Sequence, residues 1–318
     1  MSKKILIIDA MNTFIRNYVI NPSLDAHGAP IGGCKGFLMT LQKLTRQIEP
    51  DKIVVVWDGG GGSAKRRAIA KEYKEGRAPL KLNRAYSGMS ALEESQNRYD
   101  QMAKTIDYLN NMPVIQLMIE NIEADDVIGY ITSQMQSIKD DIKIIVSMDK
   151  DFYQLCDDKT IVYRPIKNEF LNKKRILEEY NIHPNNFALA RAIDGDKSDN
   201  LEGVKGVGMK SIAKKMPFFA EEKAVTFDDL RKFLVSAGVT KMNKSILREQ
   251  KLVERNYKLM QLYTPSISVK NTQHIRNTVE GFKPSFNRTE VVKKMLLDGI
   301  NEYNWDALFQ KFRALVTT

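Results

Sequence analysis

The stretch KILIIDAMN at residues 4–12 contains four consecutive apolar residues, three of them β-branched, followed at once by Asp9. A short run that is apolar on both faces is typical of a strand buried in a parallel sheet. Further runs of this kind follow, separated by longer amphipathic stretches that suit the helical crossovers between parallel strands. We therefore predict an α/β fold with a mostly parallel central sheet flanked by helices. Its other strands are expected at residues 52–58, 112–119, 143–149 and 160–165.

The strand pattern stops near residue 185, and the rest of the chain has mostly helical periodicity and many charged residues. We predict an α/β domain at residues 1–185, a helical region at 186–265 and a C-terminal helical extension at 266–318. In the extension, aromatic and aliphatic side chains of residues 302–316 recur at helical spacing. This pattern favours a helix that packs on its own domain over a partner-binding tail.

The chain has 318 residues and a formal net charge of +10, from 49 Lys and Arg against 39 Asp and Glu. This charge is compatible with nucleic acid as a partner, and equally with lysine faces exposed to solvent. The longest apolar runs, such as residues 53–57, have about five residues against the roughly 20 of a membrane span, so neither a span nor a signal peptide is expected. Cys34 and Cys156 lie far apart and support neither a disulfide framework nor a zinc site.

Acidic residues gather where the predicted strands end, which is the edge where open α/β sheets form their functional crevice. Any one of these residues alone reads as a cap or a turn residue. Two carboxylates at 4 Å, however, repel each other by about 4 kcal/mol at an effective dielectric of about 20, so a group of them needs compensating charge. The acidic residues concerned are Asp9, Asp58, Asp149 and Asp151 after strands, Glu123, Asp125 and Asp126 at a predicted helix start, and Asp194, Asp196 and Asp199 in DGDKSDN.

Divalent cations would supply that compensation. The three histidines, His27, His183 and His274, lie outside the acidic motifs, so an all-oxygen site favours Mg²⁺ or Mn²⁺ over zinc. Two such ions about 4 Å apart would stabilise the attacking and leaving oxygens of a phosphodiester displacement. The sequence has no Gly-x-x-x-x-Gly-Lys-Ser/Thr loop, which argues against nucleotide hydrolysis.

The motifs IIDAMN, WDG, YKEGR, IEADD, SMDKDFYQL, GDKSDN and GVKGVGMKSIAKK, in this order, resemble those of the structure-specific 5′ nucleases. This family includes flap endonucleases, 5′-3′ exonucleases and phage enzymes such as T-even ribonuclease H. The resemblance covers about residues 4–215 and reaches toward 265. Asp194 lies outside the family pattern and reads as a turn residue. The resemblance implies a first metal cluster of Asp9, Asp58, Glu123 and Asp125 with Asp126 beside it, and a second formed or flanked by Asp149, Asp151, Asp196 and Asp199.

A basic segment follows the second predicted strand: Lys65 to Arg84 contains eight basic and two acidic residues. A run of this kind by itself reads as a solvated helix face, but its place directly after Asp58 and the four glycines at 59–62 favours a functional role. The resemblance implies a helical arch over the active site at about residues 63–110.

Within this arch the family's YK-x-x-R pattern matches Tyr73, Lys74 and Arg77. The resemblance implies that Lys74 and Arg77 steady the scissile phosphate and that Tyr73 stacks on a base. Further DNA contacts are expected from Arg66, Arg67 and Lys71, the first two guiding a 5′ single strand.

Gly203, Gly206 and Gly208 precede a short basic stretch with Lys210 and Lys214, which by itself reads as a turn before a helix. The resemblance implies a helix-hairpin-helix or helix-three-turn-helix element that grips the duplex backbone without reading sequence, with K⁺ as a further cation at the hairpin. Phosphate contacts of this kind predict steep salt dependence.

The resemblance as a whole implies a Mg²⁺-dependent structure-specific 5′ nuclease with two metal ions, in which Mn²⁺ can substitute. The expected substrates are DNA with 5′ flaps, nicks or branches and RNA/DNA duplexes, as in primer removal during DNA replication and in repair. The competing interpretation is a non-catalytic branched-DNA binding protein on the same scaffold. We expect a cytoplasmic monomer, in the host cytoplasm if the source is a bacteriophage, with replication proteins as further partners.

Overall fold

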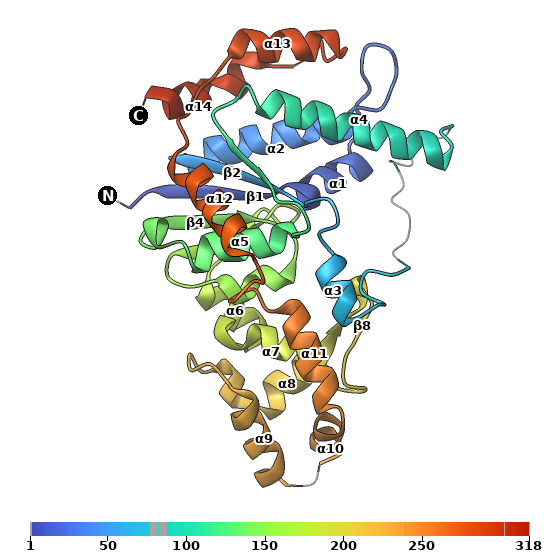
Figure 1. The fold of residues 1–318 in the computed structure, drawn as a ribbon, viewed down its shortest axis with the longest axis vertical. Coiled ribbons are helices and arrows are strands. Elements are labelled where there is room, and N and C mark those ends of the chain that lie inside the picture. Colours follow the sequence, from blue (N-terminus) through green and yellow to red (C-terminus); the bar gives the residue numbers. More distant parts are fainter. Residues whose placement is uncertain (1, 77–81, 83–87, 239, 302, 318) are drawn as a thin grey trace.

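The computed structural model of the protein describes residues 2–76, 82, 88–238, 240–301 and 303–317 (Figure 1). Within these residues, the main sheet has six strands in the order β3-β2-β1-β4-β5-β6, of which only β6 is antiparallel to its neighbour. The predicted mostly parallel sheet is confirmed, whereas β6 has too few residues for its periodicity to be recognised. The strands are β1 (Lys4–Asp9), β2 (Lys52–Trp57), β3 (Ile115–Met118), β4 (Ile142–Val146), β5 (Thr160–Arg164) and β6 (Glu169–Leu171).

Both faces of the sheet are covered, as the uninterrupted apolar runs require. In β1, Leu6 and Ile8 belong to one apolar cluster, and Ile5 and Ile7 belong to the other, because successive side chains of a strand point to opposite faces. The first cluster is formed with α1 (Ala10–Ile20), α2 (Gly32–Ile48), α4 (Ala91–Leu109), α13 (Arg288–Leu297) and α14 (Trp305–Thr317).

The C-terminal extension packs on the α/β core. Phe309 and Phe312 of α14 are fully buried in the same cluster as Phe37 of α2 and Val291 of α13. The expected packing of this helix on its own domain is confirmed: α14 contacts α2, and Figure 1 shows α13 and α14 at the end of the molecule away from α9 and α10.

The segment predicted as an arch has two parts in the structure. Residues 64–76, which we call the arch base, contain α3 (Ala64–Ile69) and the turns that follow it. The second part, α4, packs on α2 and buries Gln101, Thr105 and Tyr108. The C-terminal half of α4 therefore belongs to the helical layer of the core rather than to an arch over the strand ends.

The other face of the sheet shares one continuous core with the helical region. Ile212, Leu230 and Ile246 of the helical region lie in the same apolar cluster as Ile5 and Val54 of the sheet, so the boundary expected at residue 185 separates sequence patterns rather than cores. No helix in the described part of the chain combines the length and apolar character needed to cross a bilayer. The helices here are α5 (Ala124–Ser133), α6 (Lys173–Tyr180), α7 (Pro184–Asp194), α8 (Met209–Lys215), α9 (Phe227–Ser236), α10 (Lys241–Arg248), α11 (Gln250–Met260) and α12 (Val269–Glu280).

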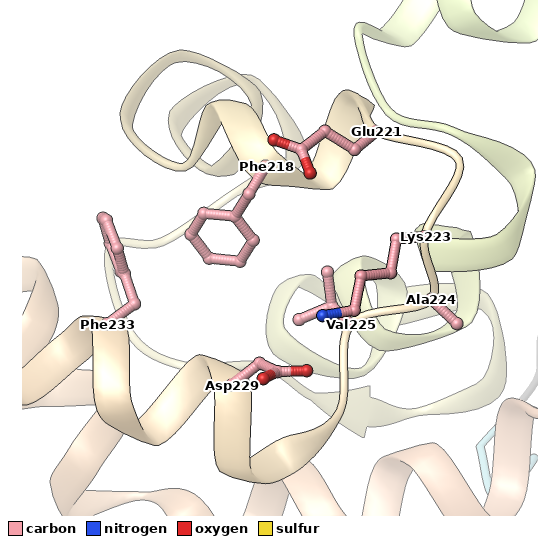
Figure 2. Close-up of a pocket in the computed structure, with 7 residues that line it drawn as sticks. All are labelled: Phe218, Glu221, Lys223, Ala224, Val225, Asp229 and Phe233. Atoms are coloured by element: carbon pink, nitrogen blue, oxygen red, sulfur yellow. The ribbon is translucent and has the colours of Figure 1, made fainter.

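A hollow of about 170 Å³ opens between α9 and the short helix η4 (Pro217–Ala220), where the rings of Phe218 and Phe233 lie 4.7 Å apart (Figure 2). Its polar rim is formed by Glu221, Lys223 and Asp229. None of the predicted site residues lines this hollow.

Candidate active site

The carboxylates expected at the strand ends do come together there. Because β1 lies between β2 and β4, the residues that follow these three parallel strands share one edge of the sheet. Asp9 ends β1, Asp58 follows β2, and Asp149 lies three residues beyond β4. The Asp58 carboxylate accepts a hydrogen bond of 2.8 Å from the backbone N–H of Ala124, which brings the start of α5, and with it Asp125, to the same edge.

Burial and mutual repulsion perturb these acids. Burial, together with the charges of Asp58 and Asp149, raises the pKa of Asp9 to about 7 in spite of hydrogen bonds from Asn12 and Ser147. Burial likewise raises the pKa of Asp125 well above its usual range, with added repulsion from Asp149 and Asp9. Such opposition to the charged form is what several partly buried carboxylates close to one another produce.

Asp149 connects this first group to the second. Burial raises its pKa, and the charges of Asp199 and Asp196 add to the effect. Its side chain accepts a hydrogen bond from the backbone N–H of Asp151 at 2.8 Å. The predicted acids of the two clusters therefore form one continuous acidic group at this edge, which we call the acidic pocket, whereas Glu123 and Asp126 bind basic residues of the arch base.

Arg191 of α7 lies inside the second group and was not among the predicted residues. Its guanidinium donates to Asp151 at 3.1 Å and to Asp196, and the residue is only 9% exposed. Burial raises the pKa of Asp151 to about 7 in spite of this partner. Burial also acts to raise the pKa of Asp196, but Arg191 and Ser198 outweigh it and hold that pKa below its usual value. The signal in the sequence was a single arginine in the apolar helix FALARAID, one turn ahead of the acidic motif.

Ser147 also went unpredicted. Its hydroxyl donates to Asp9 at 2.8 Å and accepts the backbone N–H of Asp149 at 3.0 Å, so it fixes the two acids relative to each other. The serine lies between the end of β4 and Asp149 in the motif SMDKD, where spacing alone does not reveal a bridging role.

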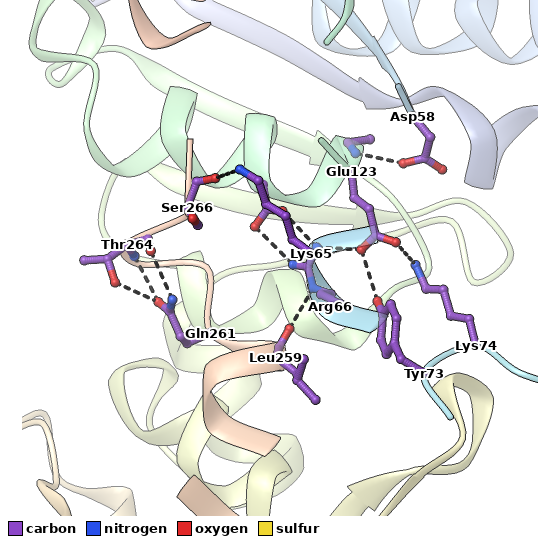
Figure 3. Close-up of polar contacts among 12 residues, drawn as sticks. Asp58, Lys65, Arg66, Tyr73, Lys74, Glu123, Leu259, Gln261, Thr264 and Ser266 are labelled. Atoms are coloured by element: carbon purple, nitrogen blue, oxygen red, sulfur yellow. Dashed lines mark hydrogen bonds and ion pairs between the residues drawn. The ribbon is translucent and has the colours of Figure 1, made fainter. Parts of the chain in front are cut away.

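Glu123 and Asp126 lie at the start of α5 and meet the arch base (Figure 3). Arg66 donates to Glu123 at 2.5 Å and to both oxygens of Asp126 at 2.8 and 3.0 Å. Glu123 also accepts from Lys74 at 2.7 Å and from the Tyr73 hydroxyl at 3.1 Å. Burial acts to raise the pKa of Glu123, but Arg66 and Lys74 outweigh it and hold the pKa below its usual value.

This arrangement changes the expectation for two arch residues. Arg66 was expected to guide a single strand, but it is buried and its guanidinium is occupied by Glu123, Asp126 and the carbonyl of Leu259. Tyr73 was expected to stack on a base, but it is 3% exposed. In the structure, both residues hold the arch base against α5 instead of presenting themselves to a ligand.

The other predicted arch residues are placed differently. Arg67 and Lys71 are exposed, as DNA contacts would require. The Lys74 ammonium lies at the edge of the acidic pocket, 4.9 Å from the centre of the Tyr73 ring. Arg77 lies outside the described residues, and its role stays a prediction.

The three glycines of the predicted hairpin differ in what they do. A side chain on Gly203 would place Cβ 1.9 Å from the carbonyl oxygen of Asp194, so this glycine permits a close backbone crossing within the protein. Gly206 has a φ of +78°, which favours glycine, whereas the Cβ of an alanine at Gly208 would have ordinary contacts. Lys210 and Lys214 of the following helix, α8, are exposed. Contacts of this hairpin with DNA stay a prediction.

The donor chemistry fits a hard divalent cation. The acids supply oxygen ligands, and burial together with mutual repulsion disfavours their charged forms, which a cation would reverse. Within the described residues, no three Asp, Glu, His or Cys side chains are already arranged around one point as metal ligands.

The parallel sheet, the acidic pocket and the basic segment beside it are together typical of an α/β nuclease. The family model described as 5′-3′ exonuclease, N-terminal resolvase-like domain, matches residues 4–181, and the chain belongs to this family. A 5′-3′ exonuclease of Buchnera aphidicola is 32% identical over 213 residues, which cover 66% of this chain and 68% of that protein. The flap endonuclease Xni of a Shewanella species is 28% identical over 261 residues, which cover 82% of this chain and 90% of that protein.

The fold matches a solved structure of the phage T5 flap endonuclease in a pseudo-enzyme-product complex with DNA and metal ions. The TM-score is 0.67 at 18% identity, and the match covers 99% of this chain and 100% of that one. These findings confirm the resemblance to the 5′ nucleases and the nuclease fold expected from it.

Proposed function

We propose that this protein is a Mg²⁺-dependent structure-specific 5′ nuclease that hydrolyses phosphodiesters near 5′ ends and flap junctions. The observation that carries the proposal is the partly buried, mutually repelling group of carboxylates at the strand ends with Lys74 beside it. An acidic pocket binds divalent cations, and a neighbouring ammonium binds the phosphate those cations activate.

Two ions would be held by the acids of the pocket. A bound pair of Mg²⁺ or Mn²⁺ ions supplies an activated water and stabilises the charge that develops on the phosphate. The proposed ligands are Asp9, Asp58, Glu123 and Asp125, with Asp126 beside them, for one ion, and Asp149, Asp151, Asp196 and Asp199 around the other.

Three basic side chains of the protein have distinct roles in this proposal. Lys74 binds a non-bridging oxygen of the scissile phosphate, which requires its ammonium to exchange the Glu123 carboxylate for the phosphate. Arg66 keeps Glu123 in place when Lys74 leaves it, since Arg66 binds Oε2 of Glu123 whereas Lys74 binds Oε1. Arg191 orients Asp151 and Asp196 in the same way.

The proposed substrates are DNA with 5′ flaps, nicks or branches, and RNA/DNA duplexes such as primers removed during replication and repair. The matched phage T5 enzyme was solved with DNA and metal ions, which supports a DNA substrate. The exposed residues Arg67, Lys71, Lys210 and Lys214 would contact phosphates, and K⁺ would assist at the glycine hairpin.

Cleavage of a labelled 5′-flap substrate tests the function. Products are expected with Mg²⁺ or Mn²⁺ and none with EDTA, whereas the same protein in EDTA should still bind the flap. Binding without any metal-dependent product would instead identify a non-catalytic branched-DNA binding protein. Product lengths from flap, nicked and RNA-primed substrates then separate endonuclease from exonuclease action.

Lys74→Ala tests the role of the ammonium. We expect the single-turnover rate to fall about 100-fold with little change in flap affinity, because the contact acts on charge that develops in the transition state. Lys71→Ala is the matched control: it removes an exposed lysine of the same segment and should change affinity rather than rate. Equal losses of rate and affinity for Lys74→Ala would contradict the proposed role.

A further inference from the structure

The arch base is held by the helical region more than a hundred residues away in the chain. Figure 1 places α3 beside α11 and β8, and Figure 3 shows the arch base against residues 259–266. Ala70 and Tyr73 form an apolar cluster with Leu201, Leu259 and Met260. The polar contacts are Lys74 N to Asp199 O at 2.8 Å, Asn200 Nδ2 to Glu72 O at 3.0 Å, Arg255 Nη1 to Glu72 Oε1 at 2.7 Å, Arg66 Nε to Leu259 O at 2.9 Å and Lys65 Nζ to Ser266 O at 2.6 Å.

Glu72 is the centre of this contact. Its carbonyl oxygen is held by Asn200 and its carboxylate by Arg255, so two separate elements of the helical region grip one residue. Two residues further on, the backbone N–H of Lys74 is bound to the carbonyl of Asp199, and Lys74 has a φ of +57°, a conformation that non-glycine residues seldom adopt without support. The backbone of Lys74 is thus set from the helical region and not from the sheet.

The same residues belong to the unit that carries the glycine hairpin. Asn200 lies between the short strands β7 (Gly195–Asp196) and β8 (Leu201–Glu202), and β8 leads directly into Gly203. Next to Arg255, the buried Asn256 donates to the carbonyls of Ala192 and Glu202, which ties α11 to that strand. A few hydrogen-bonded residues therefore connect the glycine hairpin to Glu72.

We propose that Glu72, Asn200 and Arg255 form a latch that positions Lys74 according to what the glycine hairpin holds. They are positioning residues, and their effect is substrate specificity: hydrolysis is fast when the hairpin grips a duplex and slow on a single strand that leaves the hairpin empty. This inference rests on the proposed function, because it assigns duplex selectivity to the same site.

Charge reversal across the latch is a feasible test, because the Glu72 and Arg255 side chains are partly exposed (40% and 30%) and such pairs contribute little to global stability. The variants are Glu72→Arg, Arg255→Glu and the double exchange of both. Glu75→Arg, an exposed residue of the same segment, is the matched control.

Single-turnover rates with Mg²⁺ are compared on a 5′-flap substrate and on a single strand of the same sequence. Each single reversal should lower the flap rate by about tenfold or more, leave the single-strand rate within about threefold of wild type, and leave flap affinity in EDTA within about threefold. The double exchange should restore the flap rate. Equal losses on both substrates, no loss, or no restoration would overturn the latch.

Backbone hydrogen exchange of residues 70–76 in EDTA reads the same contact without catalysis. Exchange should rise in each single reversal, return in the double exchange and stay unchanged in Glu75→Arg, because the Lys74 N–H is bound to Asp199. If the wild type cleaves no flap with any divalent metal, the proposed function fails and the latch loses its role with it. If the wild type cleaves and exchange is unchanged in the single reversals, the latch alone is refuted.

Discussion

Removal of the Arg66 guanidinium should be among the most damaging single changes in this protein. Arg66 is 9% exposed and donates to Glu123, to both oxygens of Asp126 and to the carbonyl of Leu259. Loss of one partner of a buried ion pair costs about 3–5 kcal/mol, because the remaining charge stays buried without compensation. Glu123 keeps Lys74, and the Asp126 side chain is 17% exposed to water, so we expect the lower end, about 3 kcal/mol, for Arg66→Ala.

Urea unfolding in EDTA, followed by circular dichroism, measures this loss. The neighbouring Arg67→Ala is the matched control, because Arg67 is exposed and such surface changes usually stay within about 0.5 kcal/mol. Arg66→Lys keeps the charge but not the fork of donors, and should fall between the two. If Arg66→Ala and Arg67→Ala lose equal free energy of unfolding, the reasoning from buried charge is refuted.

Three further outcomes follow from the same contacts. In EDTA, the free energy of unfolding of the wild type should fall relative to that of Asp9→Asn as pH rises from about 4 to above 7. The reason is that the folded state raises the pKa of Asp9 from 3.8 to about 7, so it holds a proton that the unfolded chain has already released. Urea unfolding at several pH values measures this difference, and a difference that does not change with pH would contradict it. Gly203→Ala should lower the free energy of unfolding by about 1–3 kcal/mol or more, because its Cβ would clash with the carbonyl oxygen of Asp194. Gly208→Ala should lower it by less than about 1 kcal/mol. Equal shifts of the melting temperature in the two variants would contradict the close backbone crossing at Gly203. Phe309→Ala should cost about 3–5 kcal/mol in chemical denaturation, since the ring is fully buried against the core, and a loss below 1 kcal/mol would show that α14 is not part of that core.

Much of the fold was accessible from local patterns. Apolar runs such as residues 52–58 predict buried strands because a strand in a covered parallel sheet needs apolar side chains on both faces. The acids after β1, β2 and β4 could be assigned to one pocket because parallel strands present their carboxyl ends at a common edge. Short elements such as β6 could not be predicted, because three residues are too few to show a periodic pattern of apolar side chains.

The partners of the basic residues could not be predicted in this way. Arg66 and Arg67 are adjacent in the sequence and equally basic, yet one is buried between two acids and the other is exposed. A long, flexible cation can turn toward solvent, nucleic acid or a carboxylate, and only the neighbours brought by distant segments decide among them. The same holds for Tyr73, whose family pattern suggested an exposed ring and whose actual environment is an apolar cluster with Leu259 and Met260.

The sequence by itself determined the sheet, the row of acids along its edge and the membership of the 5′ nuclease family, because these depend on residue type and spacing within single strands and motifs. Tertiary structure alone decided that Arg66 and Arg191 neutralise particular acids and that the backbone N–H of Lys74 is bound to Asp199. The physical reason is that burial and pairing of a charge depend on which distant backbone lies within about 3 Å of it, and that distance is set by packing of the whole chain.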